Sequence, residues 1–164
     1  MTLDRLWAGW RAEYVGGAGA EVPTDDDDGC VLCRVVREPG AVVWRGERVA
    51  VILNAYPYTT GHVMALPVRH VADLEALDAD ESAQLWAATT DAVRAVKAAY
   101  GPHGLNVGAN LGTAGGAGVP GHLHLHVVPR WAGDTNFMTT VAETRVLPES
   151  LDASYKRLQE AWPR

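Results

Sequence analysis

The segment His122-Leu-His-Leu-His-Val-Val128 constrains this 164-residue chain more than any other, because histidine alternates strictly with apolar residues along it. A period of two is that of a β-strand, in which successive side chains point to opposite faces of the sheet. The pattern predicts a strand over His122–Val128, ended by Pro129, with three imidazoles on one face and three apolar side chains packed on the other. A lone histidine on a sheet is usually structural, whereas three aligned imidazoles favour a functional site.

These three histidines cannot all bind one metal ion. His122 and His126 lie four residues apart, about 13 Å at roughly 3.3 Å per residue, whereas zinc ligands lie about 2.0–2.1 Å from their ion. Two alternate histidines could share an ion, or the three could have different roles. The other candidate is nucleophilic catalysis at phosphorus by a neutral imidazole, with the middle residue, His124, flanked on both sides.

The stretch before the strand, residues 112–121, contains five glycines among its ten residues. Backbone without Cβ atoms can approach an anion closely and offer N–H groups to phosphate oxygens. Glycine-rich turns are common, so the loop alone is weak evidence. Next to three aligned histidines it supports a phosphate-binding site.

Other segments show ordinary signals of secondary structure. Val49–Leu53 and His62–Leu66 are apolar runs separated by a turn and predict two paired strands. Asp78 and Glu81 form a capping box before a helical repeat that ends at Gly101-Pro102. Leu105–Asn110 predicts a further short strand, and Pro148–Arg164 a short helix.

Composition excludes several classes of protein. With 14 Lys+Arg against 20 Asp+Glu, the net charge of −6 argues against a partner as long and anionic as a nucleic acid. Asp25–Asp28 supply much of this charge and are typical of a solvated loop. No apolar stretch is long enough to span a membrane or act as a signal peptide. The two cysteines, Cys30 and Cys33, suit a metal knuckle or a redox pair, which fits a reducing, cytoplasmic compartment.

The chain resembles the histidine triad (HIT) family, because His122-Leu-His124-Leu-His126-Val-Val matches the motif of that family. The resemblance extends to Asn54, to Gly61-His62-Val-Met-Ala-Leu-Pro-Val-Arg-His70, to Asn106-Val-Gly-Ala-Asn110 and to Pro129-Arg130. It predicts an N-terminal extension with an acidic loop (1–29), a HIT domain (30–138) and a C-terminal extension with a short helix (139–164). The segments at 6–11 and 130–138 are similar to the bacterial branch that includes diadenosine tetraphosphate phosphorylases and hydrolases.

The resemblance implies an α+β fold with an antiparallel sheet carrying helices, usually as a homodimer. It implies that His124 attacks the α-phosphorus of a nucleotide and forms a nucleotidyl-histidine intermediate. His126 is expected to hydrogen-bond around the phosphate, Asn54 to contact the ribose hydroxyls and Asn110 to face the phosphates. Many members carry Ser or Gln four residues before the first triad histidine, where this chain has Gly118, with Thr113 the nearest loop hydroxyl.

The resemblance also implies which residues would bind a zinc ion. Two thiolates supply half of a tetrahedral zinc site. Zinc-bearing members of the family take the other two ligands from the positions of His70 and His122. The set Cys30, Cys33, His70 and His122 therefore predicts a structural zinc, whereas the alternative is a pair of buried thiols.

The expected function is cleavage of dinucleoside polyphosphates, with diadenosine tetraphosphate favoured, by hydrolysis or phosphorolysis. The alternatives are an adenosine phosphoramidate hydrolase and a non-catalytic, zinc-containing nucleotide-binding module. Trp131 and Phe137 could line an adenine pocket or a dimer interface, and His62 and His103 are expected to be structural.

Overall fold

A computed structural model describes residues 29–38, 40–134 and 147–163 of the chain. Five strands in these ranges form one antiparallel sheet in the order β1-β2-β3-β5-β4. They are β1 (Val42–Arg45), β2 (Val49–Leu53), β3 (Val63–Pro67), β4 (Gly104–Ala109) and β5 (Leu125–Arg130). The helices are α2 (Val31–Arg37), a 3-10 turn η1 (Leu74–Ala76), α3 (Ala79–Tyr100) and α5 (Leu151–Glu160). None of the described helices is long and apolar enough to cross a membrane.

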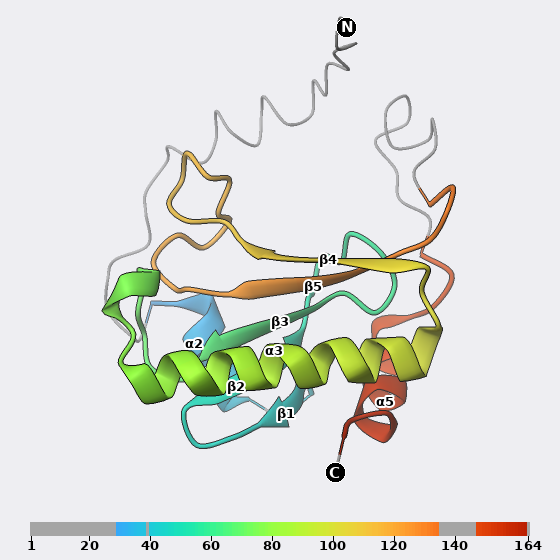
Figure 1. The fold of residues 1–164 in the computed structure, drawn as a ribbon, viewed down its shortest axis with the longest axis horizontal. Helices are drawn as coiled ribbons and strands as arrows, with labels where there is room; N and C mark the ends of the chain where they lie inside the picture. Colours follow the sequence, from blue (N-terminus) through green and yellow to red (C-terminus); the bar gives the residue numbers. More distant parts are fainter. Residues whose placement is uncertain (1–28, 39, 135–146, 164) are drawn as a thin grey trace, which may run out of the picture.

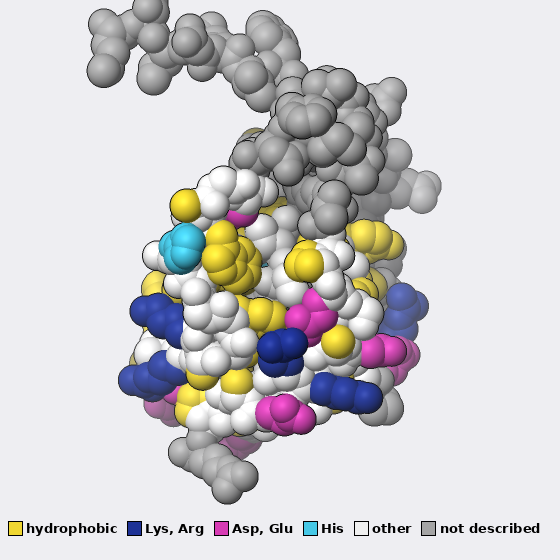
Figure 2. Space-filling model, turned by 90° about the vertical axis from the view of Figure 1, so that its right-hand side faces the viewer, with side chains coloured by type: hydrophobic (Ala, Val, Ile, Leu, Met, Phe, Trp, Pro, Cys, Tyr) yellow, Lys and Arg dark blue, Asp and Glu magenta, His cyan; other side chains and the backbone are white. Residues whose placement is uncertain are grey.

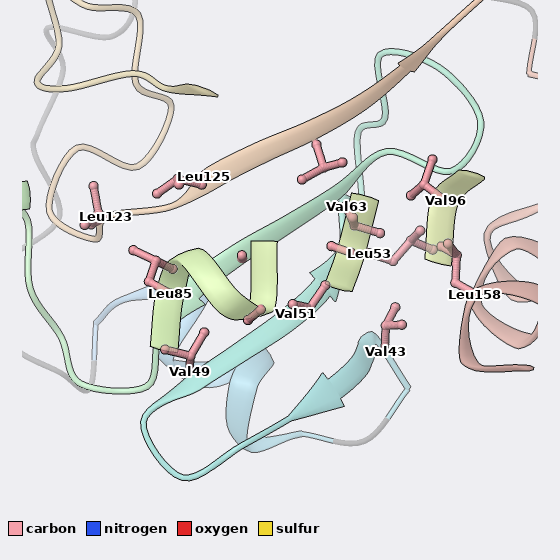
Figure 3. Close-up of a cluster of buried hydrophobic side chains, with 14 residues drawn as sticks. Val43, Val49, Val51, Leu53, Val63, Leu85, Val96, Leu123, Leu125 and Leu158 are labelled. Atoms are coloured by element: carbon pink, nitrogen blue, oxygen red, sulfur yellow. The ribbon is translucent and has the colours of Figure 1, made fainter. Parts of the chain in front are cut away.

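Helices pack against both faces of the sheet, with α3 in front of it and α2 behind it (Figure 1). Every residue of β2 and β3 is buried, so alternate side chains supply two separate hydrophobic clusters. Figure 3 shows the cluster beneath α3 and α5, which includes Val49, Val51, Leu53, Leu85, Val96, Leu123, Leu125 and Leu158. The cluster on the opposite face includes Leu32, Val36, Ala50, Ile52, Met64 and Leu66, beside Cys30 and Cys33.

Capping residues fix the ends of α3 as the sequence predicts. The Asp78 carboxylate accepts from the backbone N–H of Glu81, and the Glu81 carboxylate accepts from that of Asp78. Gly101 ends the helix in the left-handed conformation, with φ of 54°. The predicted C-terminal helix is confirmed as α5, and the ring of Trp162 beyond it stacks on Trp44 of β1 at 5.5 Å.

The predicted strand His122–Val128 is displaced in the structure, where β5 spans Leu125–Arg130. Pairing with β3 begins at Leu125, opposite Ala65, because β3 ends at Pro67, which has no N–H to donate. The strand runs through Pro129 because pairing with β3 ends at Val127, so the side of Pro129 toward β3 needs no ladder N–H. The alternation itself is confirmed: Leu123, Leu125 and Val127 all lie in the cluster beneath α3.

Charged side chains of both signs are interspersed at the end of the molecule where α3 ends and α5 lies (Figure 2). The described residues visible in this view form no extended basic surface of the kind that nucleic-acid binding requires.

Candidate active site and metal site

Four side chains from distant parts of the chain meet at one end of α2. Cys30 is its N-cap, Cys33 lies in its first turn, His70 follows β3, and His122 precedes β5. Their ligand atoms all lie within 4.8 Å of one another. The two sulfurs lie 3.4 and 3.3 Å from Nδ1 of His122, and Cys33 Sγ lies 3.3 Å from Nδ1 of His70.

This cluster suits a tetrahedral zinc ion. Ligand atoms about 2.0–2.3 Å from one zinc lie roughly 3.3–3.8 Å apart, which matches the three distances above. His122 Nε2 lies 2.9 Å from the carbonyl oxygen of Pro67, so Nε2 donates and Nδ1 is left with its lone pair toward the thiols. Cys30, Cys33 and His122 are buried, and His70 is partly exposed. The set predicted from the resemblance is therefore assembled and can bind a metal.

His124 lies beside the cluster and is itself buried. Its Nδ1 lies 2.7 Å from the carbonyl oxygen of His122. A carbonyl can only accept, so Nδ1 carries the proton and Nε2 keeps a lone pair. Burial lowers the pKa of His124, although the same hydrogen bond acts in the opposite direction. A neutral imidazole with a free basic nitrogen is the form needed for nucleophilic attack.

His126 is the outer member of the triad and contacts both His124 and His62. Its ring centroid lies 4.9 Å from that of His124, edge to face, and its Nδ1 lies 3.0 Å from Nε2 of His62. The backbone N–H of Tyr58 donates to Nδ1 of His62 over 3.1 Å, so the proton of His62 is on Nε2 and is donated to His126. His126 consequently carries its proton on Nε2. Burial, with a smaller contribution from His124, lowers the pKa of His126 to about 4.

The predicted substrate-binding residues lie at the ends of neighbouring strands. Asn54 follows β2, where its Nδ2 lies 3.4 Å from Nδ1 of His62 and its Oδ1 accepts from the backbone N–H of Tyr56. Asn110 follows β4 and donates from Nδ2 to the carbonyl oxygen of Gly116, which ties it to the glycine-rich loop. Gly118 lies exposed in that loop. Asn54 is thus brought to the histidines, and Asn110 to the loop.

The described part of this region carries almost no net charge. Arg130 at the end of β5 pairs with Asp134 through two bonds of 2.7 and 2.8 Å and also donates to Asn106. Trp131 begins the turn that Asp134 closes, whereas Phe137 lies outside the described residues. A neutral, histidine-rich site beside a glycine loop suits a small phosphate ester better than a nucleic acid.

The sequence reasoning underestimated His62, which it treated as structural. This residue is fully buried and connects Asn54 and Tyr58 to His126. The sequence could have indicated that His62 lies beside Asn54. The two residues adjoin paired strands in which Leu53 lies opposite Val63. His103 agrees with its expected structural role, since its Nδ1 accepts from the backbone of Ala132 at an exposed turn.

The chain is similar to known proteins over most of its length. The model of the HIT domain family matches residues 36–133. A protein named AP-4-A phosphorylase, from Mycobacterium tuberculosis H37Rv, is 42% identical over 169 aligned positions, covering 99% of this chain and 86% of its own length.

Solved structures show the same fold. A zinc-bound histidine triad family protein from Mycobacterium smegmatis aligns with a TM-score of 0.67 and 28% identity, covering 83% of this chain and 94% of its own. A hypothetical histidine triad nucleotide-binding protein from Sulfolobus tokodaii aligns with a TM-score of 0.64 and 29% identity, covering 80% and 88%.

Proposed function

This chain belongs to the HIT domain family, and on that premise we propose that it cleaves dinucleoside polyphosphates, diadenosine tetraphosphate above all. It is an enzyme of that family, acting as a nucleotide hydrolase or nucleotidyl transferase. The observation that carries the proposal is the 2.7 Å hydrogen bond from His124 Nδ1 to the His122 carbonyl, which leaves Nε2 as a nucleophile. The relative named AP-4-A phosphorylase supports the substrate class.

In the first step, Nε2 of His124 forms a bond to the α-phosphorus of the bound nucleotide. The bond from that phosphorus to the bridging oxygen breaks, and the electron pair leaves with the remaining phosphate chain. The Nε2 proton of His126 is a hydrogen-bond donor for the phosphate oxygens. In the second step, water or inorganic phosphate attacks the nucleotidyl-histidine and releases the nucleotide, which restores the imidazole. Two such displacements replace one more difficult one.

The other predicted residues have supporting roles in this proposal. Asn54 hydrogen-bonds the ribose hydroxyls from its place beside His62, and Asn110 faces the phosphates. Gly118 offers a backbone N–H where many relatives have a side chain, so the leaving phosphate depends on the loop backbone and on Thr113. Glycines with φ of 67° and 88°, Gly112 and Gly116, give that loop the curvature to surround an anion.

Zinc is proposed as a structural ion held by Cys30, Cys33, His70 and His122. When bound, it ties α2 to the segment before β5 and adds folding free energy. All four ligands come from the protein, so water activation is not its role. His122 would thereby fix the carbonyl that orients His124. The zinc-bound relative from M. smegmatis supports this assignment.

A homodimer is proposed through the edge strand β4. Among the described strands, β4 lies at one edge of the sheet, and its residues Asn106, Val107 and Gly108 are exposed. An unpaired edge offers a row of backbone N–H and C=O groups to a second copy, in a self-complementary contact. Trp86 on α3 is 58% exposed and so is not in the core. Light scattering that gives the mass of a monomer would contradict the dimer.

A cytoplasmic location completes the proposal, because Cys30 and Cys33 are buried thiols placed for a metal and are not joined in a disulfide. The expected ligands are adenine nucleotides and dinucleoside polyphosphates. Trp131 and Phe137 remain predicted to line an adenine pocket or an interface.

One assay tests the function. The full chain is incubated with diadenosine tetraphosphate and excess inorganic phosphate, and the products are separated. Adenosine diphosphate means phosphorolysis, and adenosine monophosphate with triphosphate means hydrolysis. The variant His124→Ala should lose turnover but keep its fold and nucleotide binding, whereas His103→Ala should behave as wild type. Full activity of His124→Ala would refute the mechanism.

The same assay addresses the alternatives. Turnover of an adenosine phosphoramidate without cleavage of the dinucleotide would favour the phosphoramidate hydrolase. Nucleotide binding with no turnover of either substrate would favour the binding module.

A further inference from the structure

A pocket of about 330 Å³ lies beside the metal cluster and shares Cys33 with it. Cys33 and Val68 line it. Val68 comes directly after β3, four residues beyond Met64, which is the strand partner of His126. At roughly 3.3 Å per residue, Val68 lies about 13 Å from Met64 along the strand direction. The lining includes neither His124 nor His126, although Cys33 within it contacts His122.

Arginines dominate the lining of this pocket. Arg37 comes from the end of α2, Arg45 and Arg48 flank the turn between β1 and β2, and Arg69 follows β3. Four arginines from three parts of the chain thus line one cavity. The glutamates Glu47 and Glu81 also line it. The pocket formally carries +2, or +1 if the neighbouring Asp78 is included, in a chain of net charge −6.

Two of the acidic groups, Glu81 and Asp78, accept hydrogen bonds from arginines that line the pocket. Glu81 is buried and accepts two bonds from Arg69, of 2.9 and 2.8 Å. Asp78 accepts one bond from Arg48, and Arg45 donates one bond to the carbonyl oxygen of Val36. A guanidinium has five N–H donors in a planar fork, so Arg45 and Arg48 keep donors for a ligand. That fork matches phosphate oxygens, and the pairing is charge-assisted.

We propose that this pocket binds an oligophosphate chain, with Arg45 and Arg48 as its principal contacts. Several arginines around one cavity suit a chain of phosphates better than a single carboxylate. A free oligophosphate and the phosphate chain of a nucleotide share this chemistry. The site is independent of the proposed reaction at His124 and holds whether or not that reaction occurs.

The test follows backbone amide resonances of the zinc-loaded full chain by NMR during titration with sodium tripolyphosphate. Amides of Val36, Glu47 and Val68 report on the pocket, and those of Gly116 and Ala117 on the catalytic loop. We expect saturable shifts of the pocket amides that weaken as salt rises. The double variant Arg45→Gln/Arg48→Gln should weaken this binding about tenfold or more, because two charge-assisted contacts are lost.

Matched variants keep the test independent of folding defects. Arg94→Gln removes an arginine that pairs with Asp91 on α3, outside the pocket, and should leave binding unchanged. Glu47→Gln removes a negative charge from the exposed rim and should tighten binding severalfold.

The proposal fails if tripolyphosphate shifts only the loop amides, or if the double variant and Glu47→Gln both bind as wild type does. Loss of catalysis in a His124 variant has no bearing on it. Adenosine triphosphate serves as the second ligand: tighter binding than tripolyphosphate would identify a nucleotide, and equal or weaker binding a free oligophosphate.

Discussion

His62 Nε2 lies 3.0 Å from His126 Nδ1, although one residue precedes β3 and the other lies within β5. The backbone N–H of Tyr58 holds Nδ1 of His62, and His62 in turn holds Nδ1 of His126. A main-chain amide thus determines, through two imidazoles, which nitrogen of His126 carries the proton. That amide can only donate, so Nδ1 of His62 has to accept from it.

His62 should therefore act as a positioning residue. His62→Ala removes the hydrogen bond that orients His126, and we expect kcat for dinucleotide cleavage to fall about 10²-fold, with little change in KM. His62→Gln, whose amide N–H can replace the Nε2 donor, should recover part of the loss. His103→Ala is the control for removing an exposed histidine. An unchanged kcat in His62→Ala would contradict this role.

The depressed pKa of His126 has a measurable consequence for stability. Its pKa is about 4 in the folded chain, whereas an unfolded histidine takes up its proton at about 6.5. Between these values the unfolded state binds more protons, so the free energy of unfolding falls as pH falls from 6.5 towards 4. His126→Gln should show a smaller pH dependence over this window, measured by urea denaturation at several pH values. An NMR titration of His126 with a midpoint near 6.5 would contradict the prediction.

Gly61 should resist substitution more than other glycines with positive φ. It has φ of +81°, and a Cβ there would lie 2.5 Å from the ring of Tyr100 at the end of α3. Gly101 has φ of +54° but nothing within 4 Å of a Cβ, so Gly101→Ala measures the backbone cost alone, about 1–2 kcal/mol.

Gly61→Ala adds overpacking, which typically costs about 1–3 kcal/mol more. Urea denaturation of Gly61→Ala and Gly101→Ala gives the free energy of unfolding of each variant, and the two values are compared. Equal destabilisation by the two substitutions would show that the contact with Tyr100 relaxes without cost.

Loss of the metal should destabilise the chain. Cys33→Ser removes one of four ligands, and we expect the purified variant to contain far less zinc than the wild type. Its Tm should fall by about 5 °C or more, since each kcal/mol corresponds to about 2–4 °C in a chain of this size. A chelator should lower the wild-type Tm to a similar value. Well under one zinc per wild-type chain, purified without chelator, would contradict the assignment.

Local signals made α3 predictable, whereas β5 depended on its neighbours. Asp78, Glu81 and Gly101 set the ends of the helix through contacts within a few residues, and such contacts are written in the local sequence. The start of β5 depends on where β3 stops, because a ladder needs donors on both strands. The period of two therefore identified the faces of the strand correctly and its first residue wrongly.

The candidate site was harder to predict from the sequence, because its residues come from distant parts of the chain. Cys30 and His122 are 92 residues apart, and no local pattern joins them, so only the family resemblance grouped the metal ligands. The arginine pocket is a similar case, since Arg37, Arg45 and Arg69 converge only after α2 packs behind the sheet. The boundaries predicted at residues 29 and 138 stay predictions, because they adjoin residues outside the described ranges.

Alternate residues of the segment around β5 supply the hydrophobic core and the candidate site. Leu123, Leu125 and Val127 belong to the core, while His124 and His126, interleaved with them, belong to the site. Shifting the register of this segment by one residue would exchange these sets, turning imidazoles into the core and leucines toward the substrate. Variation in length must therefore be accommodated in the glycine loop, and the strand that follows it can tolerate substitutions but not insertions or deletions.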